Sequence, residues 1–221
     1  MKTVFSKHKF NSFGRIGAYL NYLKYSPEKS KTVKLPLIIY IHGAGSRGND
    51  LDNFSVVDSL LKRIESGRIP AILTAPQCHA DTWFELFDVL LEFIDCMRNQ
   101  PDIDINRIYI CGGSMGGYTV WQVCMSKPDW FAAAVPICGG GMYWNAARLK
   151  NLPVWAFHGE EDQTVSVEES RKMVGAINLA GGNARLTVFS GIGHDSWTPA
   201  FQSDEMWAWL FAQNNNTKRL T

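Results

Sequence analysis

Short apolar runs alternate with longer amphipathic stretches along most of the chain, beginning near residue 33. The apolar runs are continuous rather than interrupted by polar residues, which is typical of strands buried on both faces of a parallel sheet. The pattern therefore predicts an α/β protein, a mostly parallel central sheet with helices on both faces. The predicted strands are Leu35–Ile41, Ala71–Ala75, Arg107–Cys111, Ala132–Cys138, Val154–His158 and Arg185–Phe189.

The stretches between these strands repeat their apolar positions at the spacing of one helix face. Between Trp83 and Arg98, apolar residues recur every three or four positions until Pro101 ends the pattern. A similar segment closes at Gly181 and Gly182, and glycine is typical of the residue that follows a helix. The predicted helices are Trp83–Arg98, Tyr118–Met125, Val167–Ala180 and Glu205–Gln213.

The beginning of the chain has a different pattern. Residues Thr3–Phe10 and Tyr19–Tyr25 flank the turn-forming segment Asn11–Gly14, which predicts a hairpin that extends one sheet edge in antiparallel fashion. No repeat, linker or shift in composition marks a boundary, so the 221 residues are predicted to form one domain. Residues 1–32 are its edge hairpin in this interpretation, and residues 214–221 are a frayed tail.

Charge and cysteine usage narrow the functional classes. The chain has 22 Lys and Arg against 21 Asp and Glu, so it lacks the positive charge that attracts nucleic acid or anionic lipid. No apolar run reaches the length of a signal segment or a membrane span, which predicts a cytoplasmic protein without membrane contact. The five cysteines form no CxxC pair and the histidines have no metal-like spacing, so we expect a reducing compartment and no metal.

Ser114 is the strongest candidate for a chemical role. It lies in the segment Gly112–Gly116, directly after a predicted strand and directly before a predicted helix. A serine on a tight strand-to-helix turn requires neighbours without side chains, because a Cβ two residues away on either side would clash across the turn. The segment therefore predicts a nucleophile elbow, with the hydroxyl at a helix N-terminus that favours developing negative charge.

A serine nucleophile requires a base and a carboxylate at the ends of later strands. Asp162 follows the strand that ends near His158, and His194 follows the last predicted strand. The order serine, aspartate, histidine is the one expected of an α/β-hydrolase. Glu161 is an alternative to Asp162, and Asp195 beside His194 is either a helix cap or a rival acid. His158, His79 and His42 receive no catalytic role.

Glycines also follow the first parallel strand, in His42-Gly43-Ala44-Gly45. Such a loop allows a backbone N–H to face a reacting carbonyl, so Ala44 and Met115 are predicted to supply the oxyanion hole. The alternative is a simple turn that ends the strand. The loop lacks the GxxxxGK(S/T) pattern of a phosphate-binding loop.

Together these motifs resemble the carboxylesterase branch of the α/β-hydrolases. The resemblance is carried by the segments Ile39–Asp50, Ala75–Gln77 with Trp83, the Ser114 elbow, Phe157–Asp162 and Gly191–His194. More narrowly, the chain is similar to the phospholipase/carboxylesterase and dienelactone-hydrolase-like group, near the feruloyl and acetyl-xylan esterases. The resemblance implies Ser114 as nucleophile, Asp162 as its orienting acid, His194 as base and no cofactor. It departs from the dienelactone hydrolases proper, which use a cysteine as nucleophile.

The substrate is less well defined than the reaction. Only residues 139–152 separate two predicted strands where many lipases carry a lid, so no large lid is expected. We therefore expect a small-molecule or oligosaccharide ester, with feruloyl or acetyl esters of plant polysaccharide as examples. Alternatives are a lysophospholipase, an acyl thioesterase, a prolyl-oligopeptidase-like peptidase or a non-enzymatic ligand-binding protein. The oligomeric state is left open. The predicted substrate contacts are Trp83, Tyr143, Trp144 and Trp197.

Overall fold

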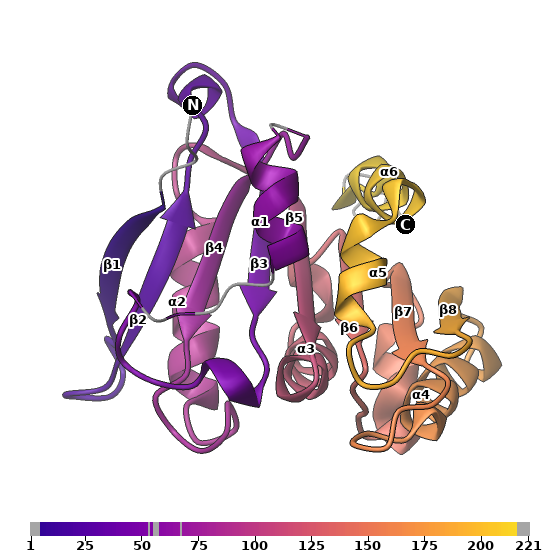
Figure 1. Ribbon diagram of the computed structural model, residues 1–221. Coiled ribbons are helices and arrows are strands. Elements are labelled where there is room, and N and C mark those ends of the chain that lie inside the picture. The colour runs from indigo at the N-terminus through magenta and orange to yellow at the C-terminus, as the bar shows by residue number, and fades with distance from the viewer. Residues whose placement is uncertain (1–4, 53, 55–57, 67, 216–221) are drawn as a thin grey trace.

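The computed structural model describes residues 5–52, 54, 58–66 and 68–215, and a mixed sheet runs through its centre (Figure 1). The eight strands lie in the order β1-β2-β4-β3-β5-β6-β7-β8. Those from β3 onward pair in parallel, whereas β1 and β2 are antiparallel to their neighbours at one edge. The α/β prediction is confirmed. The strands are β1 (Ser6–Asn11), β2 (Tyr19–Tyr25), β3 (Leu35–Ile41), β4 (Ile72–Gln77), β5 (Ile103–Gly113), β6 (Ala133–Ile137), β7 (Val154–Gly159) and β8 (Ala184–Phe189).

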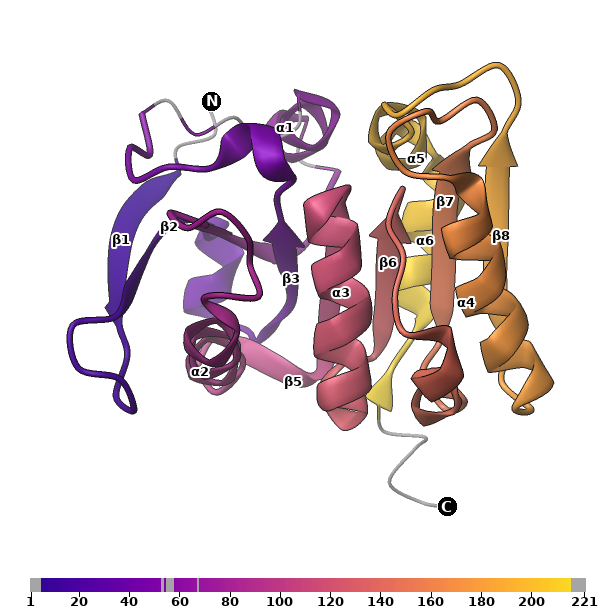
Figure 2. The ribbon, with the colours of Figure 1, turned by 90° about the horizontal axis from the view of Figure 1, so that it is seen from below.

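Two layers of helices cover the sheet (Figure 2). Helices α2, α3 and α4 pack on one face, and α1, α5 and α6 pack on the other. Short 3-10 helices occupy several loops. The α-helices are α1 (Asp58–Glu65), α2 (Phe87–Arg98), α3 (Met115–Ser126), α4 (Val167–Leu179), α5 (Trp197–Gln202) and α6 (Asp204–Ala212). The 3-10 helices are η1 (Glu28–Lys31), η2 (Ala44–Ser46), η3 (Pro128–Trp130) and η4 (Tyr143–Leu149).

Strand β3 shows why the apolar runs are continuous. Leu37 and Ile39 belong to the core beneath α2 and α3, whereas Ile38 and Tyr40 belong to the core beneath α1 and α5. Successive side chains of a strand point to opposite faces, and here both faces are covered. Every residue of β3 is therefore buried.

The N-terminal hairpin is confirmed where the structure describes it. Ser6 pairs with Lys24 across β1 and β2, and Asn21 of β2 pairs with Gln77 of β4. Thr3, the predicted start of the hairpin, lies outside the described residues. The hairpin thus continues the central sheet through β2.

The structure differs from the sequence predictions in several details. Helix α2 begins at Phe87 rather than Trp83, and the residues before it form a turn in which the Leu86 N–H donates to the Trp83 carbonyl at 3.2 Å. Helices α1 and α5 are not among the predicted elements. Asn215 is buried and donates to the Asp129 carbonyl at 3.4 Å, so the chain is not frayed there, and residues 216–221 lie outside the described part.

Close packing at Gly116 generates a stability prediction. A Cβ at Gly116 would overlap the carbonyl oxygen of Ile41, whereas one at Gly175, in the middle of α4, would meet no atom within 4 Å. We expect Gly116→Ala to lower the free energy of unfolding by at least about 2 kcal/mol through overpacking. The control Gly175→Ala should raise it by about 0.5–1 kcal/mol, because alanine favours a helix interior. Urea unfolding of both variants is the measurement, and equal stability of the two would contradict this account.

Candidate active site

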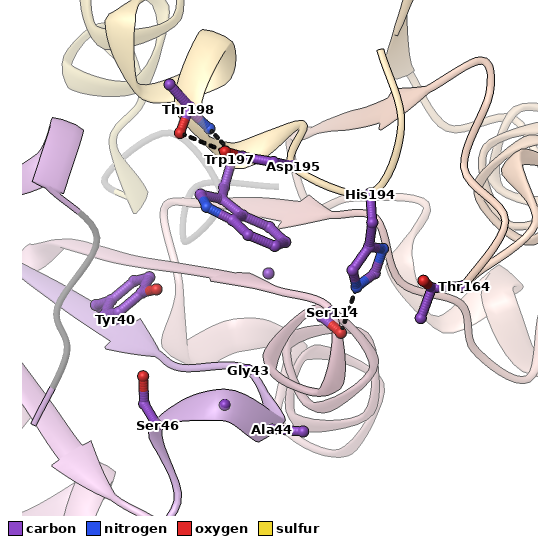
Figure 3. Close-up of a pocket in the computed structure, with 12 residues that line it drawn as sticks. Tyr40, Gly43, Ala44, Ser46, Ser114, Thr164, His194, Asp195, Trp197 and Thr198 are labelled. Atoms are coloured by element: carbon purple, nitrogen blue, oxygen red, sulfur yellow. Dashed lines mark hydrogen bonds between the residues drawn. The ribbon is translucent and has the colours of Figure 1, made fainter.

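Three of the predicted site residues meet at the carboxyl edge of the parallel strands, and Figure 3 shows two of them, Ser114 and His194. Ser114 follows β5, Asp162 follows β7 and His194 follows β8. The Ser114 hydroxyl lies 2.9 Å from His194 Nε2, and His194 Nδ1 lies 2.8 Å from Asp162 Oδ2. The fold therefore brings these three side chains into one continuous chain of hydrogen bonds.

Ser114 has a strained backbone. Its φ is 57° and its ψ is −123°, a region that residues with a side chain rarely occupy. The structure around it leaves no space to relax: a Cβ at Gly112 would lie 2.5 Å from the Ile41 carbonyl oxygen and 2.9 Å from that of Gly116. The Ser114 N–H also donates to the Ile137 carbonyl of β6 at 3.0 Å. The glycines of the elbow thus allow β3, β5 and α3 to approach closely, as predicted.

Asp162 is fixed by donors on both of its oxygens. Oδ1 accepts the backbone N–H groups of Thr164 and Val165 at 2.8 and 2.9 Å, and Oδ2 accepts the N–H of His194. Burial alone would raise the pKa of Asp162, but these hydrogen bonds outweigh burial and lower it below its ordinary value. The group is therefore a carboxylate at neutral pH.

The two alternative acids make other contacts, although Asp195 also lines the cavity at Ser114. Glu161 is exposed, and its carbonyl accepts a hydrogen bond from the Gln163 side chain at 3.4 Å. Asp195 accepts from the backbone N–H and the hydroxyl of Thr198, both at 3.1 Å. It therefore caps the start of α5, and Asp162 is the carboxylate that contacts His194.

The loop after β3 passes directly beside the Ser114 hydroxyl. A Cβ at Gly43 would lie 3.3 Å from Ser114 Cβ and 4.0 Å from its Oγ. Ala44 begins η2 and Met115 begins α3, so the N–H of each is at a helix start, where no intrahelical partner exists. The two predicted oxyanion donors are thus placed on the two segments that flank the hydroxyl.

His42 holds the Gly43 carbonyl in one orientation. Its Nε2 accepts the Cys78 N–H at 2.9 Å, so the ring proton must be on Nδ1, which donates to the Gly43 carbonyl at 2.6 Å. A trans peptide holds its N–H opposite its C=O, so fixing the Gly43 carbonyl also fixes the Ala44 N–H. Burial lowers the pKa of His42 to about 4, which keeps this ring neutral at ordinary pH.

A cavity of about 550 Å³ opens above Ser114. Figure 3 shows the Trp197 ring over one side of it and η2 along another. Trp197 meets the His194 ring edge to face, with centroids 5.4 Å apart at 87°. The predicted contact at Trp197 therefore lies in the cavity. Lining residues that sequence reasoning missed are Tyr40, Ser46, Thr164 and Thr198.

Comparison with known proteins shows the family of the chain. The sequence profile of the dienelactone hydrolase family matches residues 68–206. The chain belongs to the dienelactone hydrolase family. Among solved structures it is similar to a thermostable esterase, with 34% identity, a TM-score of 0.84 and coverage of 95% of this chain and 63% of the other. A second match, to a ferulic acid esterase, covers 96% of this chain and 100% of the other, with a TM-score of 0.71. At 16% identity this match shows the fold alone.

The curated relatives of this family member are much longer. A bifunctional acetylxylan esterase/xylanase of Neocallimastix patriciarum is 26% identical over 78 residues, which make up 35% of this chain and 12% of that protein. The chain thus spans about an eighth of this relative and 63% of the thermostable esterase. The similarity to the solved esterase concerns the fold, whereas the similarity to the acetylxylan esterase/xylanase concerns a segment of 78 residues.

Three of the four aromatic residues predicted to contact substrate do not line the cavity. Trp83 has no exposed surface, because its Nε1–H donates to the His42 carbonyl at 3.1 Å and its ring packs against the His42 ring. Tyr143 and Trp144 are exposed on η4 and do not line the cavity above Ser114. Of the four predicted contacts, the structure therefore corrects three and places Trp197 alone at the site.

One cluster of possible metal ligands occurs among the residues that the structure describes. Ligand atoms of Cys138, Asp162 and His194 lie within 4.8 Å of one another. Burial raises the pKa of the Cys138 thiol to about 12, so at neutral pH it is not the thiolate that binds metals. Asp162 and His194 are also already bonded to each other. Within the same part of the chain, no helix has the length and apolarity needed to span a bilayer.

The buried ring of His42 generates a pH prediction. Its pKa falls from 6.5 to about 4 on folding, so between these values the unfolded chain binds a proton that the folded chain rejects. The free energy of unfolding should decrease as the pH falls through this window, with about 2 kcal/mol lost to this group by pH 5. Urea unfolding at pH 7 and pH 5 measures the loss.

The control for this prediction is a pair of variants. His42→Asn cannot gain the proton and should lose less stability than the wild type between the two pH values. His8→Asn, which removes an exposed ring, should keep most of the wild-type loss. The account is wrong if His42→Asn retains the full wild-type dependence.

Proposed function

We propose that this protein is a serine carboxylic-ester hydrolase that works through an acyl-enzyme. The observation that carries the proposal is the chain of hydrogen bonds from Ser114 through His194 to Asp162, with distances of 2.9 and 2.8 Å. Membership of the dienelactone hydrolase family and similarity to an esterase support it. Ser114 is the proposed nucleophile, His194 the base and Asp162 the carboxylate that orients it.

The first step forms the acyl-enzyme. The Ser114 oxygen attacks the ester carbonyl while its proton passes to His194 Nε2, and the carbonyl electron pair moves onto oxygen. Asp162 holds the ring with Nδ1 toward itself and stabilises the positive charge that forms. When the carbonyl re-forms, the bond to the alcohol oxygen breaks and His194 returns the proton to the leaving alcohol.

The second step releases the acid. A water molecule takes the place of the alcohol, gives its proton to His194 and attacks the acyl carbon. Collapse of the second tetrahedral intermediate breaks the bond to Ser114, which regains a proton from His194. In both steps the negative oxygen is proposed to accept hydrogen bonds from the N–H groups of Ala44 and Met115. Each of these hydrogen bonds would stabilise the transition state by about 3 kcal/mol.

The cavity favours a small ester over a lipid. Its volume of about 550 Å³ is in the range of small-molecule sites, and its wall includes the Trp197 ring and the hydroxyls of Ser46 and Thr198. We infer an acyl group of modest size, such as acetyl or feruloyl, on a soluble alcohol or an oligosaccharide. The similarity of part of the chain to an acetylxylan esterase/xylanase supports this substrate class.

Replacement of the proposed nucleophile is the first test. Ser114→Ala should lower kcat for p-nitrophenyl acetate by on the order of 10⁴-fold to 10⁶-fold. His194→Gln should cause a loss of similar size, because the two side chains act as one unit. Circular dichroism and unfolding midpoints show whether the variants fold. If folded Ser114→Ala kept more than half of the wild-type rate, Ser114 would not be the nucleophile and the proposal would be wrong.

The proposed contact between Trp197 and the acyl group is tested by replacing Trp197 and, as a control, Trp144. Trp197→Ala should raise KM for methyl ferulate by about 10-fold and change KM for p-nitrophenyl acetate much less, because only the larger acyl group reaches the indole ring. Trp144→Ala, which removes an exposed ring outside the cavity, should leave both values near the wild type. Steady-state kinetics decide the question. An equal effect of the two replacements would contradict the assignment.

A further inference from the structure

His158 is a second buried histidine beside the proposed catalytic groups, and the mechanism above does not use it. It lies near the end of β7 with no exposed surface. Its Nε2 is 3.3 Å from Asp162 Oδ2 and 2.9 Å from the Val165 carbonyl oxygen. A carboxylate and a carbonyl can only accept, so Nε2 must carry a proton.

The other ring nitrogen determines the charge of His158. Nδ1 is 2.7 Å from the hydroxyl of Ser170 on α4, and that hydroxyl is 3.2 Å from the Gly139 carbonyl. If the hydroxyl donates to Gly139, Nδ1 needs its own proton and the ring is charged; if it donates to Nδ1, the ring is neutral. Burial lowers the pKa of His158, and the nearby His194 acts in the same direction, against Val165 and Asp162. The neutral ring, with Ser170 donating to Nδ1, follows.

We propose that His158 is a positioning residue that holds the Asp162 carboxylate through Nε2–H and moderates the strength of its hydrogen bond to His194. This inference rests on the proposed function of the Ser114, His194 and Asp162 side chains.

The expected effect on the reaction follows because Asp162 Oδ2 accepts from two histidines. Its negative charge is divided between two donors, His194 at 2.8 Å and His158 at 3.3 Å. Oδ1 is already bonded to two backbone N–H groups, so the carboxylate cannot rotate without breaking several bonds. Removing the His158 donor leaves more charge for His194, which favours the protonated ring, and removes one of the bonds that hold the carboxylate in place. The charged and titratable groups that act on His158 are Asp162 and His194.

Two replacements separate this role from simple packing. The amide of His158→Gln offers a donor toward Asp162 and an acceptor toward Ser170, whereas His158→Leu offers neither. For hydrolysis of p-nitrophenyl acetate, we expect His158→Leu to lower kcat by about 10-fold to 100-fold with KM within about 2-fold. The acid limb of its kcat/KM profile should move to higher pH. His158→Gln should restore most of kcat and the wild-type profile.

A proton NMR measurement gives a readout that does not depend on activity. The hydrogen between His194 and Asp162 is identified by the downfield resonance that disappears in His194→Gln. We expect this resonance to move further downfield in His158→Leu, because one fewer donor on Oδ2 strengthens the remaining bond. It should keep its position in His158→Gln. If Ser114→Ala stayed active while this resonance moved as expected, the proposed function would fail and the role of His158 would stand.

Ser170→Ala provides a second variant if His158→Leu does not fold. It leaves the ring in place but removes the hydroxyl that holds Nδ1, so it should move the resonance and kcat in the same direction by smaller amounts. The proposal is overturned if His158→Leu and His158→Gln lose activity equally with an unchanged pH profile, or if no folded variant moves the resonance.

Discussion

The contact between the elbow and the end of β3 is the constraint on which the site depends. Gly112 and Gly116 lie so close to the Ile41 carbonyl that neither position has space for a side chain. This close approach holds Ser114 at a φ of 57° and sets its hydroxyl beside Gly43. The strain of that conformation, of order 1–3 kcal/mol, persists because the sheet and α3 fix both sides of the turn. The proposed nucleophile and the proposed oxyanion loop are thus positioned by one packing contact.

The buried histidines extend this arrangement outward from the strand ends. His42 at the end of β3 orients the Gly43 carbonyl, and His158 in β7 contacts Asp162. Burial depresses the pKa of both rings, so each one is neutral and has a defined donor and acceptor side. The His194 ring faces the cavity, with 24% of its side chain exposed. The partly exposed ring is the one in contact with the proposed nucleophile, and the buried rings contact the groups around it.

The sequence predicts the elements whose signals are local. Strand β3 is recognised because all its residues are apolar or aromatic, and Ser114 is recognised because its neighbours are glycines between a strand and a helix. Asp162 is predicted as a site residue because it comes after a strand and lies between Ser114 and His194 in the sequence. Details that depend on tertiary contacts are not recognised. Trp83 is predicted to contact substrate, but it is buried and its N–H donates to the His42 carbonyl. His158 has no local signal, since its role depends on Asp162 and on Ser170 in α4.

Mapping of a covalent adduct tests the central claim most directly, namely that this fold activates one serine. A fluorophosphonate transfers its phosphonyl group to an activated serine and loses fluoride. Mass spectrometry of digested protein should find the adduct on the peptide that contains Ser114, in folded wild type only and not in His194→Gln or unfolded protein. An adduct on another residue, or none on folded and esterolytic protein, would contradict the account.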